Sequence, residues 1–122
     1  MRTLLLATTL ALAAAANVYA ASPAKPVAQA AASQKLVVID VRTPEEFADG
    51  HLQGAQLLPV DSIAQGIAAR VPDKHTPIQL YCRSGRRSAQ ALDTLKALGY
   101  TRLQNLGGLE EASRSSQRPI VR

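Results

Sequence analysis

The chain has 122 residues, a formal charge of +5, no tryptophan and a single cysteine. This length predicts one small domain, and the scarcity of aromatic residues means that aliphatic side chains must fill its core. A basic balance suits nucleic acid, a membrane surface or a small anion. The basic residues are scattered except for three arginines close together, with no basic stripe and few aromatics for stacking. Composition therefore argues against nucleic-acid binding and favours a local anion site.

Residues 1–20 have the pattern of a secretory signal peptide. A positive charge at Arg2 precedes an apolar run over residues 4–16, and the small side chains of Val18 and Ala20 mark a cleavage site. The apolar run is shorter than the roughly 20 residues that a membrane-spanning helix needs. We therefore expect cleavage of the signal, no stable membrane anchor, and a periplasmic or secreted protein.

The segment after the predicted cleavage site carries no folding signal. Residues 21–35 are rich in Ala, Pro and Ser without an apolar period, which predicts a flexible leader. No internal repeat or second domain follows. We expect one folded domain over residues 36–113 and a loose polar tail over residues 114–122.

The first strand and helix of the domain have clear signals. Residues 36–41 are a short β-branched run, typical of a strand buried on both faces. Thr43 is then expected to cap a helix, with Pro44 at its first position and Glu46 closing a capping box. Gly50 is expected to end this short helix.

The next segments continue the alternation of strands and helices. Residues 55–59 are a second strand candidate, and Asp61 is expected to cap a helix that runs through Arg70. Residues 77–82 form the third predicted strand, which places Cys82 at its carboxyl end.

The C-terminal part of the domain repeats this order. From Ser88 the apolar spacing changes to a helical period, and Gly99 stands where a C-terminal cap is expected. Residues 100–106 are a fourth strand candidate, and residues 109–113 a short helix. Alternating strands and helices predict an α/β fold, with a central, mostly parallel sheet and helices on its faces. Ligands of such sheets bind beyond the carboxyl ends of the strands, where Cys82 falls.

Cys82 is the candidate nucleophile. A thiol must ionise before it attacks, and an ordinary thiol stays mostly protonated at neutral pH. The cations of Arg83, Arg86 and Arg87 favour the thiolate. Gly85 lets the loop curl so that its backbone N–H groups point inward as an anion nest, and the following helix directs its positive end at the same place. One device therefore activates the thiol and binds an anion.

Other interpretations of these residues carry less weight. A lone cysteine is often a small buried hydrophobe, and an arginine run is often a solvated surface. Their combination favours an active thiolate, because a buried thiol has no use for adjacent cations. We assign no catalytic role to His51, expected to hydrogen-bond within the fold, or to His75, expected in an exposed loop. These residues make no credible metal site, and no cofactor is expected.

The motifs resemble those of a known family. Four segments resemble motifs of rhodanese domains, in the same order and with the usual spacing. They are residues 40–47 with 50–55, residues 81–88, residues 98–100 and residues 105–109. Residues 81–88 resemble the active-site loop of the family. With a signal peptide in front, the chain is most similar to periplasmic single-domain members.

This resemblance implies a fold and a reaction. The fold is a doubly wound, rhodanese-like α/β domain with a central parallel sheet. In the reaction, Cys82 takes the outer sulfur of thiosulfate, releases sulfite, and passes the persulfide sulfur to cyanide or a thiol.

The resemblance also implies roles for the residues around Cys82. The substrate-binding cradle is made by five consecutive loop residues: Arg83, Ser84, Gly85, Arg86 and Arg87. Arg86 and Arg87 are the side chains expected on the sulfonate. Asp40 and Arg42 are expected to support the site from beneath by hydrogen bonding.

Three alternatives stay open at this point. Phosphatases and arsenate reductases of similar architecture separate the cysteine from the arginine by five residues, whereas four residues separate Cys82 from Arg87. Ser88 holds the position of that arginine, and Tyr81 stands where phosphatases place a histidine, so the loop favours sulfur over phosphate. The second alternative is a non-catalytic persulfide carrier, and the third is a structural domain with an incidental thiol. Residues 109–112 lack the aromatic common after the double glycine, which leaves the natural acceptor open.

Overall fold

The computed structural model describes residues 35–122. The predicted signal peptide over residues 1–20, and the leader as far as residue 34, lie outside the described residues. In the part described, no helix is long and apolar enough to cross a membrane.

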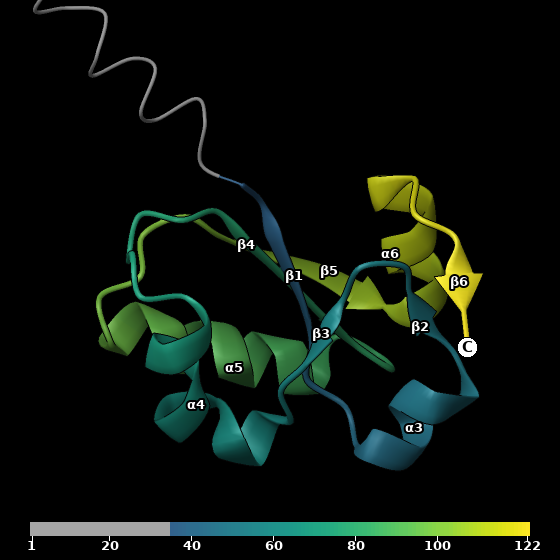
Figure 1. The fold of residues 1–122 in the computed structure, drawn as a ribbon, viewed down its shortest axis with the longest axis horizontal. Helices are drawn as coiled ribbons and strands as arrows, with labels where there is room; N and C mark the ends of the chain where they lie inside the picture. The colour runs from purple at the N-terminus through teal and green to yellow at the C-terminus, as the bar shows by residue number, and fades with distance from the viewer. Residues whose placement is uncertain (1–34) are drawn as a thin grey trace, which may run out of the picture. The chain divides into compact units, whose positions relative to one another are not determined.

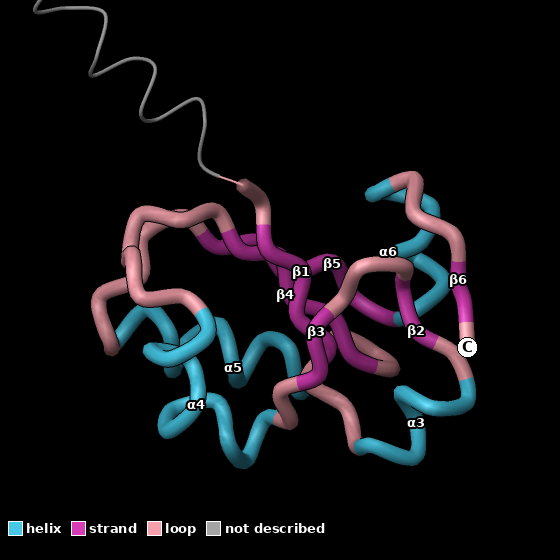
Figure 2. The backbone as a smooth tube through the Cα atoms, viewed as in Figure 1, coloured by secondary structure: helices cyan, strands magenta, loops and turns pink. Residues whose placement is uncertain are grey.

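A four-stranded parallel sheet forms the centre of this unit (Figures 1 and 2). The strand order is β3-β1-β4-β5, and every neighbouring pair is parallel. The strands are β1 (Val37–Asp40), β3 (Gln56–Leu57), β4 (Ile78–Cys82) and β5 (Leu103–Gly108). A second, antiparallel pair consists of β2 (His51–Leu52) and β6 (Ile120–Val121).

Helices cover both faces of the sheet. They are α3 (Pro44–Asp49), a 3-10 helix (Val60–Ser62), α4 (Ile63–Arg70), α5 (Arg86–Ala97) and α6 (Leu109–Ser116). Helices α4 and α5 lie on one face and α6 on the other (Figure 1). The predicted fold class, an α/β domain with a mostly parallel central sheet, is confirmed.

The alternation of side chains along the strands divides the core in two. Ile39, Leu80 and Cys82 face the larger cluster, to which α4 and α5 contribute. Val38 and Tyr81 face the smaller cluster beneath α6. Neighbouring residues of a strand point to opposite faces, so Cys82 ends β4 on the side of α5.

The first helix forms as the sequence predicts. The Thr43 hydroxyl oxygen accepts a hydrogen bond from the Glu46 N–H at 3.2 Å, and a Glu46 carboxylate oxygen accepts one from the Thr43 N–H at 3.1 Å. Pro44 occupies the first turn and Gly50 is the C-terminal cap. Both members of the capping box are thus satisfied.

The expected cap at Asp61 is wrong. Asp61 lies inside the 3-10 helix, and α4 begins after it with no side-chain cap at Ser62. The N–H of Val60 donates to the Val41 carbonyl at 3.0 Å, and the N–H of Ser62 donates to the Pro59 carbonyl at 2.8 Å. These bonds tie the chain to the end of β1 and wind it into a tight turn before the helix starts.

Helix α5 begins at Arg86, earlier than the start predicted at Ser88. Gly85 is its N-cap in the left-handed conformation, with φ of 94°, and the Ala89 N–H donates to the Gly85 carbonyl at 3.1 Å. The first turn is polar, so the apolar spacing does not reveal it. At the other end, the helical period predicts Leu98 on the same apolar face as Leu95, but Leu98 is 37 % exposed.

Two strands differ from their predicted bounds. Of the strand predicted over residues 55–59, only Gln56–Leu57 (β3) pairs with a neighbour. The strand predicted over residues 100–106 begins later, at Leu103, and extends to Gly108 as β5. Tyr100 is buried instead, and its hydroxyl donates to the Val71 carbonyl oxygen. Tyr100 is an aromatic residue with a high strand propensity, but its side chain packs into the core ahead of the strand.

The expectation of a loose tail over residues 114–122 is wrong. Helix α6 continues to Ser116, and β6 then pairs with β2. The Gln53 N–H donates to the Pro119 carbonyl at 2.9 Å, and the Arg122 guanidinium donates to the Asp49 carbonyl at 3.0 Å. Backbone pairing with a distant segment holds this polar stretch, and a two-residue strand has too few apolar positions to show in the sequence.

Candidate active site

The loop between β4 and α5 curls around the sulfur of Cys82. Cys82 is the last residue of β4 and is fully buried. The Gly85 N–H donates to its Sγ at 2.9 Å, which the left-handed backbone of Gly85 makes possible. Helix α5 starts immediately after this glycine, so its positive end is directed at the same sulfur. The loop therefore curls around the sulfur as the sequence predicts, and its role in binding an anion stays a prediction.

The surroundings of Cys82 favour its thiolate. Burial raises the pKa of the thiol, but a hydrogen bond from the Ser88 side chain opposes it. Backbone hydrogen bonds from Ser88, Ser84 and Gly85 act in the same direction, and the resulting pKa of Cys82 lies below the ordinary 9.0. Hydrogen bonding to the charged form thus outweighs desolvation.

Hydrogen bonds of Ser88 and Asn105 connect α5 and the loop before it to β5. The Ser88 hydroxyl is 2.7 Å from the Asn105 Oδ1, 3.1 Å from the Gly85 carbonyl oxygen and 3.5 Å from the Cys82 Sγ. Asn105 Nδ2 donates to the same carbonyl at 3.1 Å, and Asn105 Oδ1 accepts from the Gly107 N–H at 2.9 Å. A hydroxyl has one proton to donate, so it can move between Asn105 and the sulfur as charge develops.

We expect Ser88→Ala to raise the pKa of Cys82, because it removes the side-chain hydrogen bond that favours the thiolate. The midpoint of the pH profile for alkylation by iodoacetamide should move to higher pH. Sulfur loading at neutral pH should fall roughly ten-fold, the usual scale for a hydrogen bond to a charged group. Ser115→Ala, on the exposed part of α6, should change neither. An unmoved midpoint in Ser88→Ala would contradict this role.

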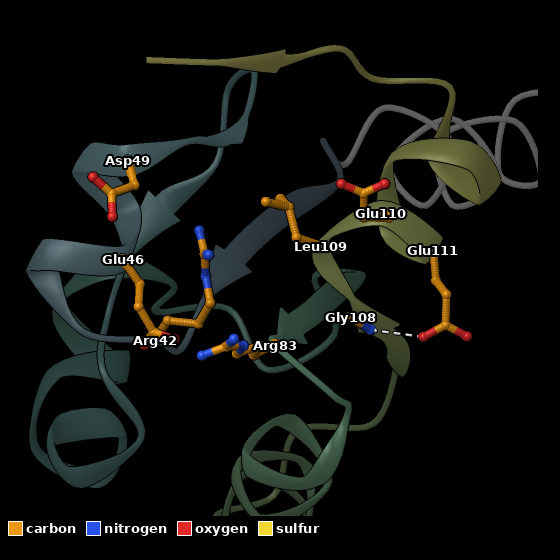
Figure 3. Close-up of a pocket in the computed structure, with 8 residues that line it drawn as sticks. All are labelled: Arg42, Glu46, Asp49, Arg83, Gly108, Leu109, Glu110 and Glu111. Atoms are coloured by element: carbon orange, nitrogen blue, oxygen red, sulfur yellow. Dashed lines mark hydrogen bonds between the residues drawn. The ribbon is translucent and has the colours of Figure 1, made fainter.

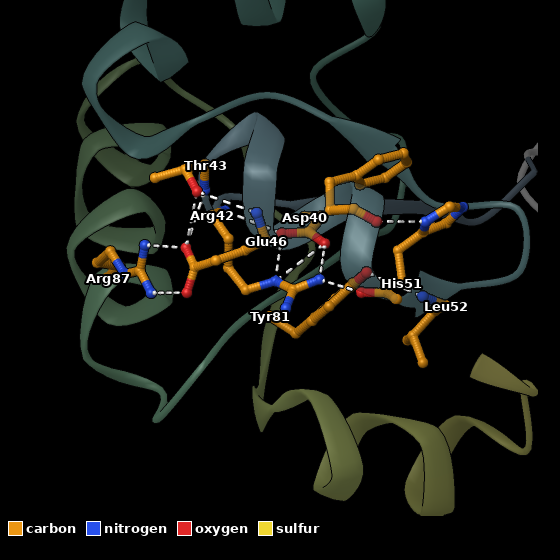
Figure 4. A network of polar contacts seen from close by, with 10 residues as sticks. Asp40, Arg42, Thr43, Glu46, His51, Leu52, Tyr81 and Arg87 are labelled. Carbon is orange, nitrogen blue, oxygen red and sulfur yellow. Dashed lines mark hydrogen bonds and ion pairs between the residues drawn. The ribbon is translucent and has the colours of Figure 1, made fainter. Parts of the chain in front are cut away.

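Arg87, expected on the bound anion, is held by a carboxylate of this chain. Its two terminal nitrogens donate to the Glu46 carboxylate at 2.8 and 3.0 Å (Figure 4). The hydrogen bond from Arg87 is the main cause that lowers the pKa of Glu46 to about 2. Arg83 and Arg86 are exposed. No local feature of the sequence indicates this pair, since Glu46 and Arg87 are 41 positions apart.

Asp40, at the end of β1, and Arg42, which follows it, form a buried ion pair. An Asp40 carboxylate oxygen lies 2.7 Å from Arg42 Nη2, which also donates to the Gly50 carbonyl oxygen at 2.6 Å. The Arg42 guanidinium lies 5.6 Å from the centroid of the Tyr81 ring, whose hydroxyl accepts from the Leu52 N–H at 3.0 Å. This network joins the ends of β1 and β4 to α3 and β2 (Figure 4). Its contribution to catalysis stays a prediction.

A cavity of about 510 Å³ borders the cradle (Figure 3). Gly108, which is paired with Cys82 in the sheet register, belongs to its wall. A side chain on Gly108 would overlap the Arg83 carbonyl oxygen, so glycine lets β5 approach the cradle closely. The lining residues are Arg42, Glu46, Asp49, Arg83, Gly108, Leu109, Glu110 and Glu111.

Both histidines lie as expected. Nδ1 of His51 is 2.8 Å from the Phe47 carbonyl oxygen, and the two rings stack with centroids 3.7 Å apart. His75 is exposed and its Nδ1 is 3.1 Å from the Thr101 hydroxyl. Within residues 35–122, no three His, Cys, Asp or Glu side chains are grouped to hold a metal ion.

Comparison with known proteins identifies the family. The sequence model of a protein family, the rhodanese-like domain, matches residues 23–115. The chain belongs to the rhodanese-like domain family. The sequence resemblance is thus confirmed over most of the chain.

Several relatives cover most of this domain. Over 73 residues the chain is 44% identical to thiosulfate sulfurtransferase PspE of Escherichia coli, with 60% of this chain and 70% of that protein covered. It is 35% identical over 89 residues to thiosulfate sulfurtransferase GlpE of Pseudomonas fluorescens, covering 73% and 80%. A solved rhodanese with anions from E. coli is 39% identical, with a TM-score of 0.67, and covers 72% of this chain and 99% of that one.

Proposed function

We propose that this protein is a thiosulfate sulfurtransferase that works through a persulfide on Cys82. The observation that carries the proposal is the buried Cys82 sulfur, which accepts hydrogen bonds from the Gly85 N–H and Ser88 hydroxyl and has a lowered pKa. Relatives named thiosulfate sulfurtransferase support the same reaction.

The first step transfers one sulfur atom to the enzyme. The Cys82 thiolate attacks the outer sulfur of thiosulfate, the S–S bond of thiosulfate breaks, and its electron pair leaves with sulfite. The backbone N–H groups of the cradle then stabilise the negative charge on the outer sulfur of the persulfide. No external oxidant or reductant is consumed.

The second step regenerates the thiolate. A cyanide or thiolate acceptor attacks the outer sulfur, and the electron pair of the persulfide bond returns to Cys82. Because sulfite leaves before the acceptor reacts, the two substrates are converted by ping-pong kinetics. In this scheme Asp40 and Arg42 support the site through Gly50 and Tyr81 and take no chemical part.

Steady-state kinetics test this scheme directly. Rates measured while thiosulfate and cyanide are varied should give parallel double-reciprocal lines. Intersecting lines, together with rapid release of phosphate from an aryl phosphate, would favour the phosphatase alternative. Sulfur loading from a protein donor with negligible turnover of thiosulfate would favour the non-catalytic carrier.

The double substitution Arg86→Ala with Arg87→Ala is expected to raise the KM for thiosulfate about five-fold, because it removes two cations beside the sulfonate. The free energy of unfolding should fall by about 1 kcal/mol or less, since Arg87 loses only a partly exposed ion pair with Glu46. A wild-type KM would mean that the backbone nest and Arg83 suffice.

Glu46→Gln tests whether Glu46 competes with the bound thiosulfate for Arg87. Glutamine still serves a capping box, but it removes the charge that holds the guanidinium. We expect the KM for thiosulfate to fall about three-fold, the scale of one partly exposed ion pair. Glu45→Gln, an exposed neighbour on the same helix, is the control and should leave KM unchanged. A KM that rises in Glu46→Gln would show that the pair positions the site instead of competing with the donor.

The proposal includes export through the signal predicted over residues 1–20. The mature protein is expected to begin at Ala21 and to lie in the periplasm or outside the cell. N-terminal sequencing of the protein from a periplasmic fraction tests this, and recovery of an intact Met1 would contradict it.

A further inference from the structure

The cavity beside the cradle is rich in charge. Six of its eight lining residues are charged: Arg42, Glu46, Asp49, Arg83, Glu110 and Glu111. Its volume of about 510 Å³ lies in the range of small-molecule sites. A cavity of this size leaves room for an acceptor larger than cyanide.

Three of these charges are already compensated within the protein. Arg42 is paired with the buried Asp40, and Glu46 is paired with Arg87. A carboxylate oxygen of Glu111 accepts from the Gly108 N–H at 3.0 Å, at the positive end of α6.

Arg83, Asp49 and Glu110 are the charged lining residues without such a partner. All three side chains are exposed, and within residues 35–122 none has an ion-pair or side-chain hydrogen-bond partner. Arg83 follows Cys82 directly, whereas Asp49 ends α3 and Glu110 lies in the first turn of α6. In Figure 3 the two carboxylates stand on opposite sides of the cavity, away from Arg83.

These three charges act differently on the sulfur donor, thiosulfate, and on the sulfur acceptor. Arg83 is placed to attract the sulfonate of thiosulfate. Once sulfite has left, an incoming acceptor meets Asp49 and Glu110 on the two sides of the cavity. Their charges raise the local concentration of a cation and lower that of an anion.

We propose that this cavity selects, as sulfur acceptor, thiols that carry a positively charged group close to the sulfur. The inference rests on the proposed persulfide of Cys82. The acceptor thiolate attacks the outer sulfur, the bond from that sulfur to Cys82 breaks, and its electron pair stays on Cys82. The acceptor leaves as a persulfide, and its cation lies between Asp49 and Glu110 during the attack.

Three small thiols of different charge test the proposal. The protein is loaded with thiosulfate, freed of excess reagent and checked by mass for one added sulfur. Its discharge is then followed at low ionic strength with cysteamine, 2-mercaptoethanol and 3-mercaptopropionate, and each rate is divided by the thiolate concentration. Thiolates differ in intrinsic nucleophilicity, so rates of different thiols are not compared directly. The decisive quantity is the charge ratio, which is the discharge rate with cysteamine divided by the rate with 3-mercaptopropionate. This charge ratio is compared between the wild type and each variant.

Asp49→Asn with Glu110→Gln is the variant, and Glu45→Gln with Asp93→Asn is the control. The control removes the same charge from exposed positions outside the cavity. Relative to the wild type, the rate with cysteamine divided by the rate with 3-mercaptopropionate should fall roughly five-fold in the variant, the scale of two exposed charge interactions. It should stay unchanged in the control. The difference should shrink at 1 M salt, where the Debye length is about 3 Å.

The outcomes separate this inference from the function on which it rests. Failure of thiosulfate to load Cys82 would overturn the proposed function and the inference with it. Normal loading with equal ratios in wild type and variant would overturn the inference alone. Equal loss in variant and control would also overturn it, because the effect would then come from the net charge of the protein.

Discussion

Replacing Cys82 with serine should abolish sulfur loading and lower turnover of thiosulfate by at least about 10³-fold, as expected when the only nucleophile is removed. Cys82 is the one cysteine of the chain, so no second thiol can substitute for it. A hydroxyl at this position has no accessible ionised form and its oxygen cannot hold a persulfide. Single-turnover release of sulfite measures the loss directly.

The same substitution should leave the fold intact. Serine is close in size to cysteine and can accept the hydrogen bonds from the Gly85 N–H and the Ser88 hydroxyl. We expect a Tm within a few degrees of the wild type and unchanged circular dichroism. Sulfite release at the wild-type rate from folded Cys82→Ser would show that the chemistry lies elsewhere.

Gly85→Ala should reduce sulfur loading about 100-fold, the scale of losing one donor from a preorganised anion site. Gly85 has φ of 94°, and a methyl group there would lie 3.3 Å from the Gly107 Cα. Relief of this strain moves the Gly85 N–H away from the Cys82 sulfur. Kinetics of the first step, with sulfite release as the signal, report the change.

Gly99→Ala is the matched control for this prediction. Gly99 has φ of 99°, and its added methyl group would lie 3.3 Å from the Lys74 side chain, at the far end of α5. Each substitution should lower the free energy of unfolding by about 1–2 kcal/mol, the cost of a left-handed conformation for alanine. Only Gly85→Ala should lose activity. Equal activity losses would mean that general destabilisation, not the cradle, explains the result.

The sequence was most informative where a local rule determines structure. The capping box of Thr43 and Glu46, the alternation of strands and helices, and the place of Cys82 at a strand end each follow from a few neighbouring residues. These signals were sufficient for the fold class and for the cradle around the candidate nucleophile.

The remaining features depend on contacts between residues far apart in the chain. Arg87 meets Glu46 across 41 positions, and Ser88 meets Asn105 across 17. Nothing in either local sequence marks its partner. The pairing of β6 with β2 is equally hidden, because it rests on backbone hydrogen bonds that any polar sequence can make. The supporting residues of the site were therefore less predictable than its nucleophile.

One residue shows how the site is built into the fold. Glu46 closes the capping box of α3, pairs with Arg87 of α5 and lines the cavity beside the cradle. A single carboxylate thus connects the loop after β1 to α5, the helix that begins beside Cys82. Substitutions at Glu46 are consequently informative about both the donor site and the stability of α3.

The most direct test of the central claim is the mass of the purified protein after incubation with thiosulfate and removal of excess reagent. The persulfide mechanism predicts a gain of one sulfur atom, located on the peptide that contains Cys82, and its loss when cyanide is added. An unchanged mass, or a sulfur that remains when cyanide is present, would contradict it.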